Sequence, residues 1–242
     1  MLDVIGTVLV GVTIAVIITA ITTSLPIRLS GRLALAGAAG VWVGFAGAVS
    51  GAGALSSPMT VLAMFGAPLV ATVALVLVMP AVRRALAAIP LPLLVGLNIV
   101  RLGGVLFVLL AFTERLSGPF PYFAGWGDFA TGALAVPVVW LATRETRIGD
   151  RLIIAWNTLG LLDLILAVSL GMLSRNGSPL QLIHAGVGTA AMQTLPWAFV
   201  PTVLVPFFLI AHGIIFARLR ARRLGQFGKR PASLLGQLEA AH

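Results

Sequence analysis

Two charged residues lie inside long apolar segments of this chain and are its first candidates for chemistry. Arg101 is embedded in LNIVRLGGVLF, and Asp163 is embedded in WNTLGLLDLIL. A charge held within hydrocarbon is costly, so such residues are functional candidates by default. Both lie roughly 15 Å from the same edge of their predicted membrane spans, at about 1.5 Å of rise per residue. We therefore predict an ion pair or a shared hydrogen-bond network between them.

Polar neighbours extend this pair. Asn98 precedes Arg101 by one helical turn and shares its face, and Asn157 lies within two turns of Asp163. These amides are expected either to form hydrogen bonds between helices or to line a site with the two charges.

Further polar residues are predicted near the outer surface. Asp128 is expected to open a span after Gly127, where a carboxylate stabilises a helix N-terminus. The polar segment 174–194 supplies His184 and Gln193, and a short interfacial or re-entrant helix is expected there around 180–193. The full set of candidate binding residues is Asn98, Arg101, Asp128, Asn157, Asp163, His184 and Gln193.

Two interpretations of this polar set remain open. In the first, Arg101 and Asp163 form an internal staple that fixes the register of two helices. In the second, the set lines a site open to the outer face that binds a polar headgroup or small solute. There, Arg101 engages an anion, and Asp163 either holds Arg101 in place or carries a proton.

The residue inventory narrows the chemistry. The chain has no cysteine, so thiolate nucleophiles and cysteine-based metal sites are excluded. The single lysine, Lys229, lies in the tail, so a retinal Schiff base in the last span is excluded. His212 is placed near the inner end of that span, where we expect it to be interfacial or satisfied by a neighbour. No metal site is expected, and the sequence leaves any cofactor unknown.

No catalytic motif stands out in this inventory. The leading hypothesis is a non-enzymatic binding, transport or accessory-subunit protein that holds a lipid, pigment or small solute. The alternative is a membrane-embedded enzyme that uses Asp163 or Asp128 as its acid–base group.

The elements that position these residues are membrane-spanning helices. Of 242 residues, 59% are hydrophobic and only 10% are charged, and the mean hydropathy is +1.07. Soluble domains are about one quarter charged. We predict an all-α, polytopic bundle in a single domain, 1–217, followed by a basic amphipathic cytoplasmic tail, 218–242. About seven spans are expected, at 4–25, 33–52, 58–80, 91–112, 126–143, 152–173 and 195–217, the first of them retained rather than cleaved as a signal.

Charge alternates between the predicted connections. Of 16 basic residues, 13 fall on one side: Arg28, Arg32, Arg83, Arg84, Arg144, Arg147, Arg151, Arg218, Arg220, Arg222, Arg223, Lys229 and Arg230. Because positive residues stay cytoplasmic, we expect the N-terminus outside and the C-terminus inside. This distribution also indicates contact with anionic lipid headgroups rather than with nucleic acid.

The second predicted span has a face of glycines. Its members recur every three or four residues and are Gly37, Gly40, Gly44, Gly47 and Gly51. Such a face lets another helix approach closely in lipid. We expect it to pack within the chain, in a homo-oligomer or in a larger membrane complex, with a trough for a rigid hydrophobic ligand as the alternative.

Three motifs carry a resemblance. Arg–x–x–Gly–x–x–Phe, Gly–Asp–x–x–x–Gly and Trp–Asn–x–x–Gly–x–x–Asp begin at Arg101, Gly127 and Trp156. They resemble those of a group of bacterial multispan membrane proteins with no established activity, and the likeness covers residues 95–217. The resemblance implies a bacterial inner-membrane protein and says nothing of chemistry.

Overall fold

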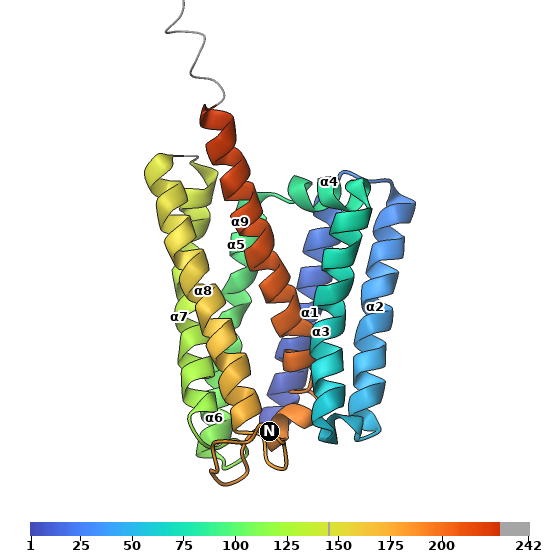
Figure 1. Ribbon diagram of the computed structural model, residues 1–242, viewed down its shortest axis with the longest axis vertical. Coiled ribbons are helices and arrows are strands. Elements are labelled where there is room, and N and C mark those ends of the chain that lie inside the picture. Colours follow the sequence, from blue (N-terminus) through green and yellow to red (C-terminus); the bar gives the residue numbers. More distant parts are fainter. Residues whose placement is uncertain (145, 228–242) are drawn as a thin grey trace, which may run out of the picture.

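The computed structural model describes residues 1–144 and 146–227, and all regular secondary structure in those residues is helical (Figure 1). Six helical stretches are long and apolar enough to cross a membrane: Leu2–Ser24, Leu29–Gly51, Pro58–Val78, Leu91–Phe112, Arg147–Leu173 and Val200–Leu224. The prediction of an all-α fold is confirmed for the described residues, and the six candidate spans support the prediction of a membrane protein.

The elements follow the predicted spans closely. In chain order they are α1 (Leu2–Ser24), α2 (Leu29–Gly51), η1 (Ala54–Ser56), α3 (Pro58–Val78), α4 (Pro80–Ala88), α5 (Leu91–Gly96), η2 (Leu97–Gly104), α6 (Val105–Phe112), α7 (Phe120–Thr143), α8 (Arg147–Leu173), η3 (Ala190–Gln193), η4 (Val200–Leu204) and α9 (Val205–Phe227). A further long helix beside the six apolar stretches, α7, packs along α8.

The fourth apolar stretch is not a uniform α-helix. Its middle third, η2, is wound as a 3₁₀ helix between α5 and α6. Since a 3₁₀ helix has about three residues per turn, residues three apart fall on one line. Asn98, Arg101 and Gly104 therefore share one face, and all three are buried. The tighter winding aims the polar residues of this segment into the bundle.

Glycines bring η2 against α7. A Cβ atom at Gly132 of α7 would lie 2.7 Å from the backbone nitrogen of Leu102. A Cβ atom at Gly104 of η2 would lie 2.9 Å from the carbonyl oxygen of Gly125. The two backbones are thus in contact at both positions, which only glycine permits.

Burial is uneven across the bundle. In an 18-residue apolar window of Leu91–Phe112, 56% of the residues are buried, whereas the corresponding share in α2 and in α3 is 11%. The main apolar core lies between α5, α7, α8 and α9 and includes Leu94, Ala135, Ile153 and Ile215. The elements that position the polar residues are therefore the best packed.

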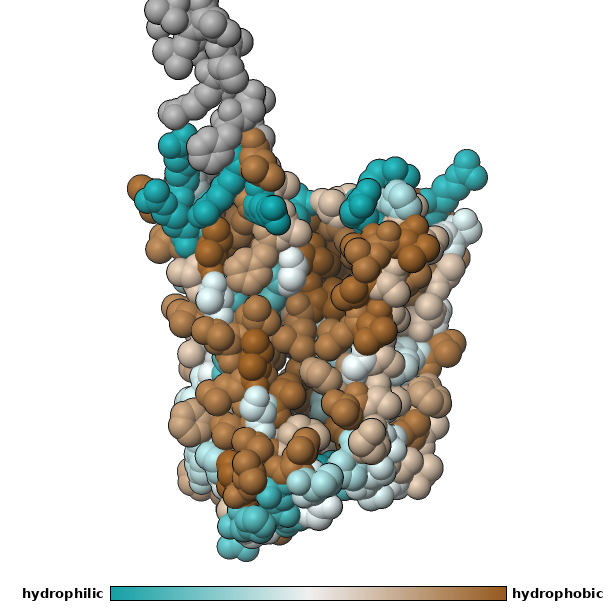
Figure 2. All heavy atoms as spheres, viewed as in Figure 1, coloured by the Kyte–Doolittle hydropathy of each residue, from teal (hydrophilic) through white to brown (hydrophobic). Residues whose placement is uncertain are grey.

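Basic residues gather at one end of the bundle. The α1–α2 connection, the end of α7, the start of α8, α4 and the end of α9 lie together at the top of Figure 1. Within the described residues, these segments and the first turn of α2 hold Arg28, Arg32, Arg83, Arg84, Arg144, Arg147, Arg151, Arg218, Arg220, Arg222 and Arg223. Figure 2 shows hydrophilic residues at both ends and a hydrophobic band between them, as a chain within a bilayer requires.

Two sequence-based expectations need correction here, and one helix was not predicted. Helix α7 begins at Phe120, because Pro121 fits the first turn of a helix, so Asp128 lies inside the helix and does not open it. The expected helix at 180–193 is reduced to the short 3₁₀ turn η3; residues 186–189 form turns, and residues 181–185 have no regular structure. A short helix that the sequence did not predict, α4, follows α3 directly.

The glycine face of α2 does not pack within the described chain. At Gly37, Gly40, Gly44 and Gly51 an added Cβ atom would meet nothing within 4 Å, and only Gly47 has a neighbour, Phe199. The intramolecular version of the packing prediction is therefore wrong for four of the five glycines. The predicted tail, 218–242, lies outside the described residues from residue 228 onward, and its first part continues α9.

Candidate functional site

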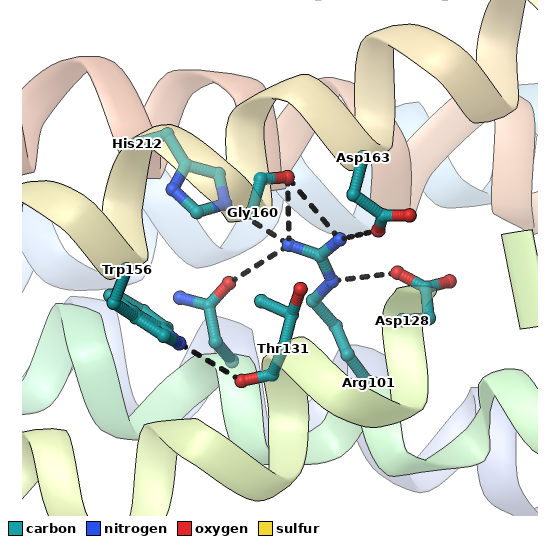
Figure 3. A network of polar contacts seen from close by, with 8 residues as sticks. Arg101, Asp128, Thr131, Trp156, Gly160, Asp163 and His212 are labelled. Carbon is teal, nitrogen blue, oxygen red and sulfur yellow. Dashed lines mark hydrogen bonds and ion pairs between the residues drawn. The ribbon is translucent and has the colours of Figure 1, made fainter. Parts of the chain in front are cut away.

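The guanidinium of Arg101 lies at the centre of a buried polar cluster (Figure 3). Its Nε donates to Asp128 Oδ1 at 2.7 Å, and its Nη2 donates to Asp163 Oδ2 at 2.6 Å. Arg101 is 3% exposed. The predicted pairing of Arg101 with Asp163 is thus confirmed, and a second carboxylate joins it.

The remaining donors of the guanidinium are also used. Nη1 donates to Asn98 Oδ1 and to the Gly160 carbonyl, each at 3.4 Å, and lies 3.0 Å from His212 Nε2. Nη2 donates to the Gly160 carbonyl at 3.4 Å as well. Because arginine only donates, His212 Nε2 must accept.

The imidazole of His212 therefore carries its proton on Nδ1. This atom lies 2.7 Å from Asn157 Oδ1, to which it donates, and Asn157 Nδ2 donates to the His212 carbonyl at 3.1 Å. A reciprocal amide–histidine pair of this kind fixes both the tautomer and the ring orientation. His212 is a neutral acceptor for Arg101.

Small residues make room for the cluster. A Cβ atom at Gly160 of α8 would lie 2.8 Å from His212 Cε1 and 2.9 Å from Thr131 Cγ2, and one at Gly127 would overlap the Asp163 carboxylate. Trp156 of α8 donates from Nε1 to the Thr131 carbonyl at 3.0 Å. The cluster is thus held between η2, α7, α8 and α9.

The charges within the cluster do not balance. One guanidinium faces two carboxylates, which leaves a net charge of −1 when both are ionised. The Asp128 and Asp163 side chains are 17% and 13% exposed, whereas that of Arg101 is 1% exposed. A cation, a proton or a hydrogen-bond donor can therefore reach the carboxylates, but an external anion cannot reach Arg101.

An apolar cavity of about 120 Å³ adjoins the cluster. It is lined by residues of α3, α6, α7, α8 and the start of the last span, among them Phe65, Phe107 and Leu164. Its charged lining residues are Asp128 and Arg175. The carboxylate of Asp128 thus belongs both to the cluster and to the cavity wall.

The structure brings together five of the seven candidate residues predicted from sequence: Asn98, Arg101, Asp128, Asn157 and Asp163. His184 is exposed in the segment after α8. Gln193 lies at the end of η3, where its carbonyl accepts a hydrogen bond from Ser50 Oγ at 3.1 Å. Neither reaches the cluster.

His212 was not among the candidate residues, although the sequence interpretation that a neighbour satisfies it is confirmed. It is fully buried rather than interfacial. Helix α9 continues to Phe227, so His212 is farther from the helix end than the predicted span, 195–217, implied. Within residues 1–144 and 146–227, no three histidine or acidic side chains are placed to hold a metal ion.

Comparison with known proteins gives one match. Residues 58–220 match the model of a domain family of unknown function, DUF8737, and the chain belongs to this family. The match spans α3 to α9 and contains all members of the Arg101 cluster. No curated protein and no solved structure matches the chain.

Proposed function

We propose that this DUF8737 member is an integral membrane protein of binding or transport type, which holds a lipid, pigment or small solute beside the Arg101 cluster. The observation that supports this is the placement of Asp128. Its carboxylate is fixed by Arg101 and also lines an apolar cavity within the bundle. An apolar pocket with few, well-placed polar groups is typical of a small-molecule site.

The cluster favours a particular kind of contact. The guanidinium of Arg101 donates to Asp128, Asp163 and internal acceptors. It therefore has no free donor for the anion that the sequence analysis expected it to bind. The carboxylates, with their surplus negative charge, instead favour a hydroxyl, an amine or a bound proton. We propose that the surplus negative charge at Asp128 is offset by a bound proton or by a hydrogen-bond donor of the ligand.

We propose seven spans with the N-terminus outside, in a bacterial inner membrane. Six apolar stretches and the adjacent α7 support that number of spans. The basic segments at the end where α9 terminates support a cytoplasmic position for that end.

Native mass spectrometry of protein extracted in mild detergent tests the binding proposal. Ala167 of α8 lines the cavity, and Ala155 of the same helix is exposed. We expect wild type and Ala155→Leu to carry a bound small molecule that Ala167→Leu lacks. If Ala167→Leu and Ala155→Leu carry the same bound molecule in equal amount, the ligand does not lie in this cavity.

We propose further that the glycine face of α2 packs against a helix of another chain, as in a homo-oligomer or in an accessory subunit of a membrane complex. Four of its glycines are open, and α2 is among the least buried spans. Gly44→Leu should reduce the assembly seen after mild extraction. Gly11→Leu, at an equally open glycine of α1, should not. An unchanged assembly in Gly44→Leu would exclude the glycine face.

An enzymatic function remains the second candidate, because the Asp128 carboxylate is open to the cavity. An acid–base role for Asp163 or Asp128 predicts that Asp→Asn variants fold and bind ligand but lose turnover. Retention of turnover in both variants would exclude that role.

A further inference from the structure

A second buried arginine lines the same cavity. Arg175 follows the end of α8 and is 4% exposed. Its Nη2 donates to the carbonyls of Leu55 and Ser56, at 2.8 Å for Ser56. Its Nε is buried without any hydrogen-bond partner. The side chain thus ties the end of α8 to η1 and keeps an unused donor.

In the part of the chain that the structure describes, Arg175 lacks the carboxylate counter-ion that Arg101 and Arg115 have. Arg101 has two carboxylates, and Arg115 pairs with Asp3 at 2.6 Å. Among the described residues, no carboxylate pairs with Arg175. Carbonyl oxygens satisfy donors but do not neutralise the charge, and arginine cannot shed its proton in a protein. A buried, unpaired cation is costly, and an anion beside it offsets part of that cost.

We propose that Arg175 binds the anionic headgroup of a single-chain amphiphile whose hydrocarbon occupies the cavity. This inference rests on the proposed binding function and names its ligand class. Apart from Asp128, Arg175 and Thr189, the cavity lining is apolar or glycine, as a hydrocarbon chain requires. Its volume of about 120 Å³ is close to that of cavities that bind a benzene ring, about 150 Å³. It therefore holds part of a chain rather than a whole lipid.

The position of Arg175 agrees with this ligand class. It lies in the segment after α8, and this segment is at the end of the bundle opposite the basic end (Figure 1). In the proposed topology, that end faces the outer membrane surface. A charged head at this level and an apolar body directed inward match the orientation of an amphiphile in a bilayer. Carboxylate and phosphate heads share the oxygen geometry that arginine recognises, so both are candidates.

The test uses the full chain in phosphatidylcholine nanodiscs and three probes with the same twelve-carbon chain (dodecanoate, dodecyl phosphate and dodecanol). We expect wild type to bind at least one anionic probe about tenfold or more tightly than dodecanol, which corresponds to one charge-assisted hydrogen bond. Tighter binding of dodecanoate would indicate a carboxylate headgroup, and tighter binding of dodecyl phosphate would indicate a phosphate headgroup. Equal binding of all three probes by wild type would overturn the assignment.

Variants test whether Arg175 causes the preference for an anionic probe. Arg175→Gln keeps a donor for the η1 carbonyls but removes the charge, and it should lose the preference for the anionic probe. Arg175→Lys should retain part of it, and Arg115→Gln, at a partly exposed arginine near the same end of the molecule, should leave it unchanged. A preference that survives in Arg175→Gln would overturn the proposal, and so would its loss in Arg115→Gln. If Arg175→Gln does not fold, the wild-type selectivity and Arg175→Lys decide the matter.

The same probes separate this inference from the proposed function. If Ala167→Leu abolishes binding of every probe while wild type does not discriminate among them, the cavity remains a binding site and only the role of Arg175 fails. If Ala167→Leu leaves all binding intact, the cavity is not the site and the proposed function fails with it.

Discussion

Replacing Arg101 should be far more damaging than replacing either carboxylate that it binds. Arg101→Leu removes the only cation of the cluster and leaves Asp128 and Asp163 facing each other across a largely buried space. Removal of one partner from a buried ion pair costs about 3–5 kcal/mol of folding free energy. For a chain of this size, such a loss corresponds to a fall in Tm of roughly 6–20 °C.

Asp163→Asn should behave differently. It leaves Arg101 paired with Asp128, keeps an oxygen acceptor at the second position and brings the cluster from a net charge of −1 to neutrality. We therefore expect a clearly smaller loss of stability than for Arg101→Leu. The triple variant with leucine at all three positions should recover much of the Arg101→Leu loss, because it leaves no unpaired charge.

Thermal unfolding in a mild detergent, followed by circular dichroism, measures these differences. Arg115→Leu is the matched control, because its ion pair with Asp3 is solvent-exposed and contributes about 1 kcal/mol or less. A Tm for Arg101→Leu within a few degrees of that of Arg115→Leu would refute the reasoning, as would a triple variant less stable than Arg101→Leu alone.

Three further predictions follow from the packing and the charge distribution. Asn157→Leu leaves the imidazole that it orients with a buried unpaired N–H, and should cost about 1–3 kcal/mol in chemical unfolding; no loss would contradict the hydrogen bond. Gly104→Leu should prevent folding because η2 touches α7 at this position. Gly103→Leu should fold, since nothing lies within 4 Å of its Cβ position. Equal expression of folded protein for the two variants would contradict this packing. Because the chain has no cysteine, single-cysteine labelling with an impermeant reagent should modify Leu182→Cys in intact cells but not Arg84→Cys, and the reverse pattern would invert the proposed orientation.

The sequence predicted the helices and the pairing of Arg101 with Asp163 because both depend on local signals. Apolar runs near twenty residues specify spans in any bundle. Two opposite charges at equal depth must meet or remain unpaired, so their depths alone indicated a contact. The same reasoning placed Asn98 and Asn157 correctly beside them.

The partners contributed by α7 and α9 were harder to predict. The sequence predicts a helix start at Asp128 because the aromatic, proline and glycine residues before it are typical of a loop. Pro121 in fact opens the helix, which moves Asp128 to the depth of Arg101. The depth of His212 depends on where α9 ends, and hydropathy alone does not define that end. Gly104 and Gly132 also depend on which helices touch, and a single sequence does not specify that.

The glycine face of α2 shows the same limit. Its spacing predicted a face suited to close packing, and the face exists, but spacing does not name the partner. The structure leaves most of these glycines open. Arg175 lies outside the predicted spans, so the cost of intramembrane charge does not identify it from sequence. Its burial and its unpartnered Nε are properties of the folded chain.

An experimental density map of the protein in lipid nanodiscs, at a resolution that shows side chains, tests the central claim most directly. We predict that Asp128 and Asp163 both contact the Arg101 guanidinium and that elongated density occupies the cavity between Asp128 and Arg175. A cavity closed by side chains, or an Arg101 side chain turned away from the two carboxylates, would contradict the account.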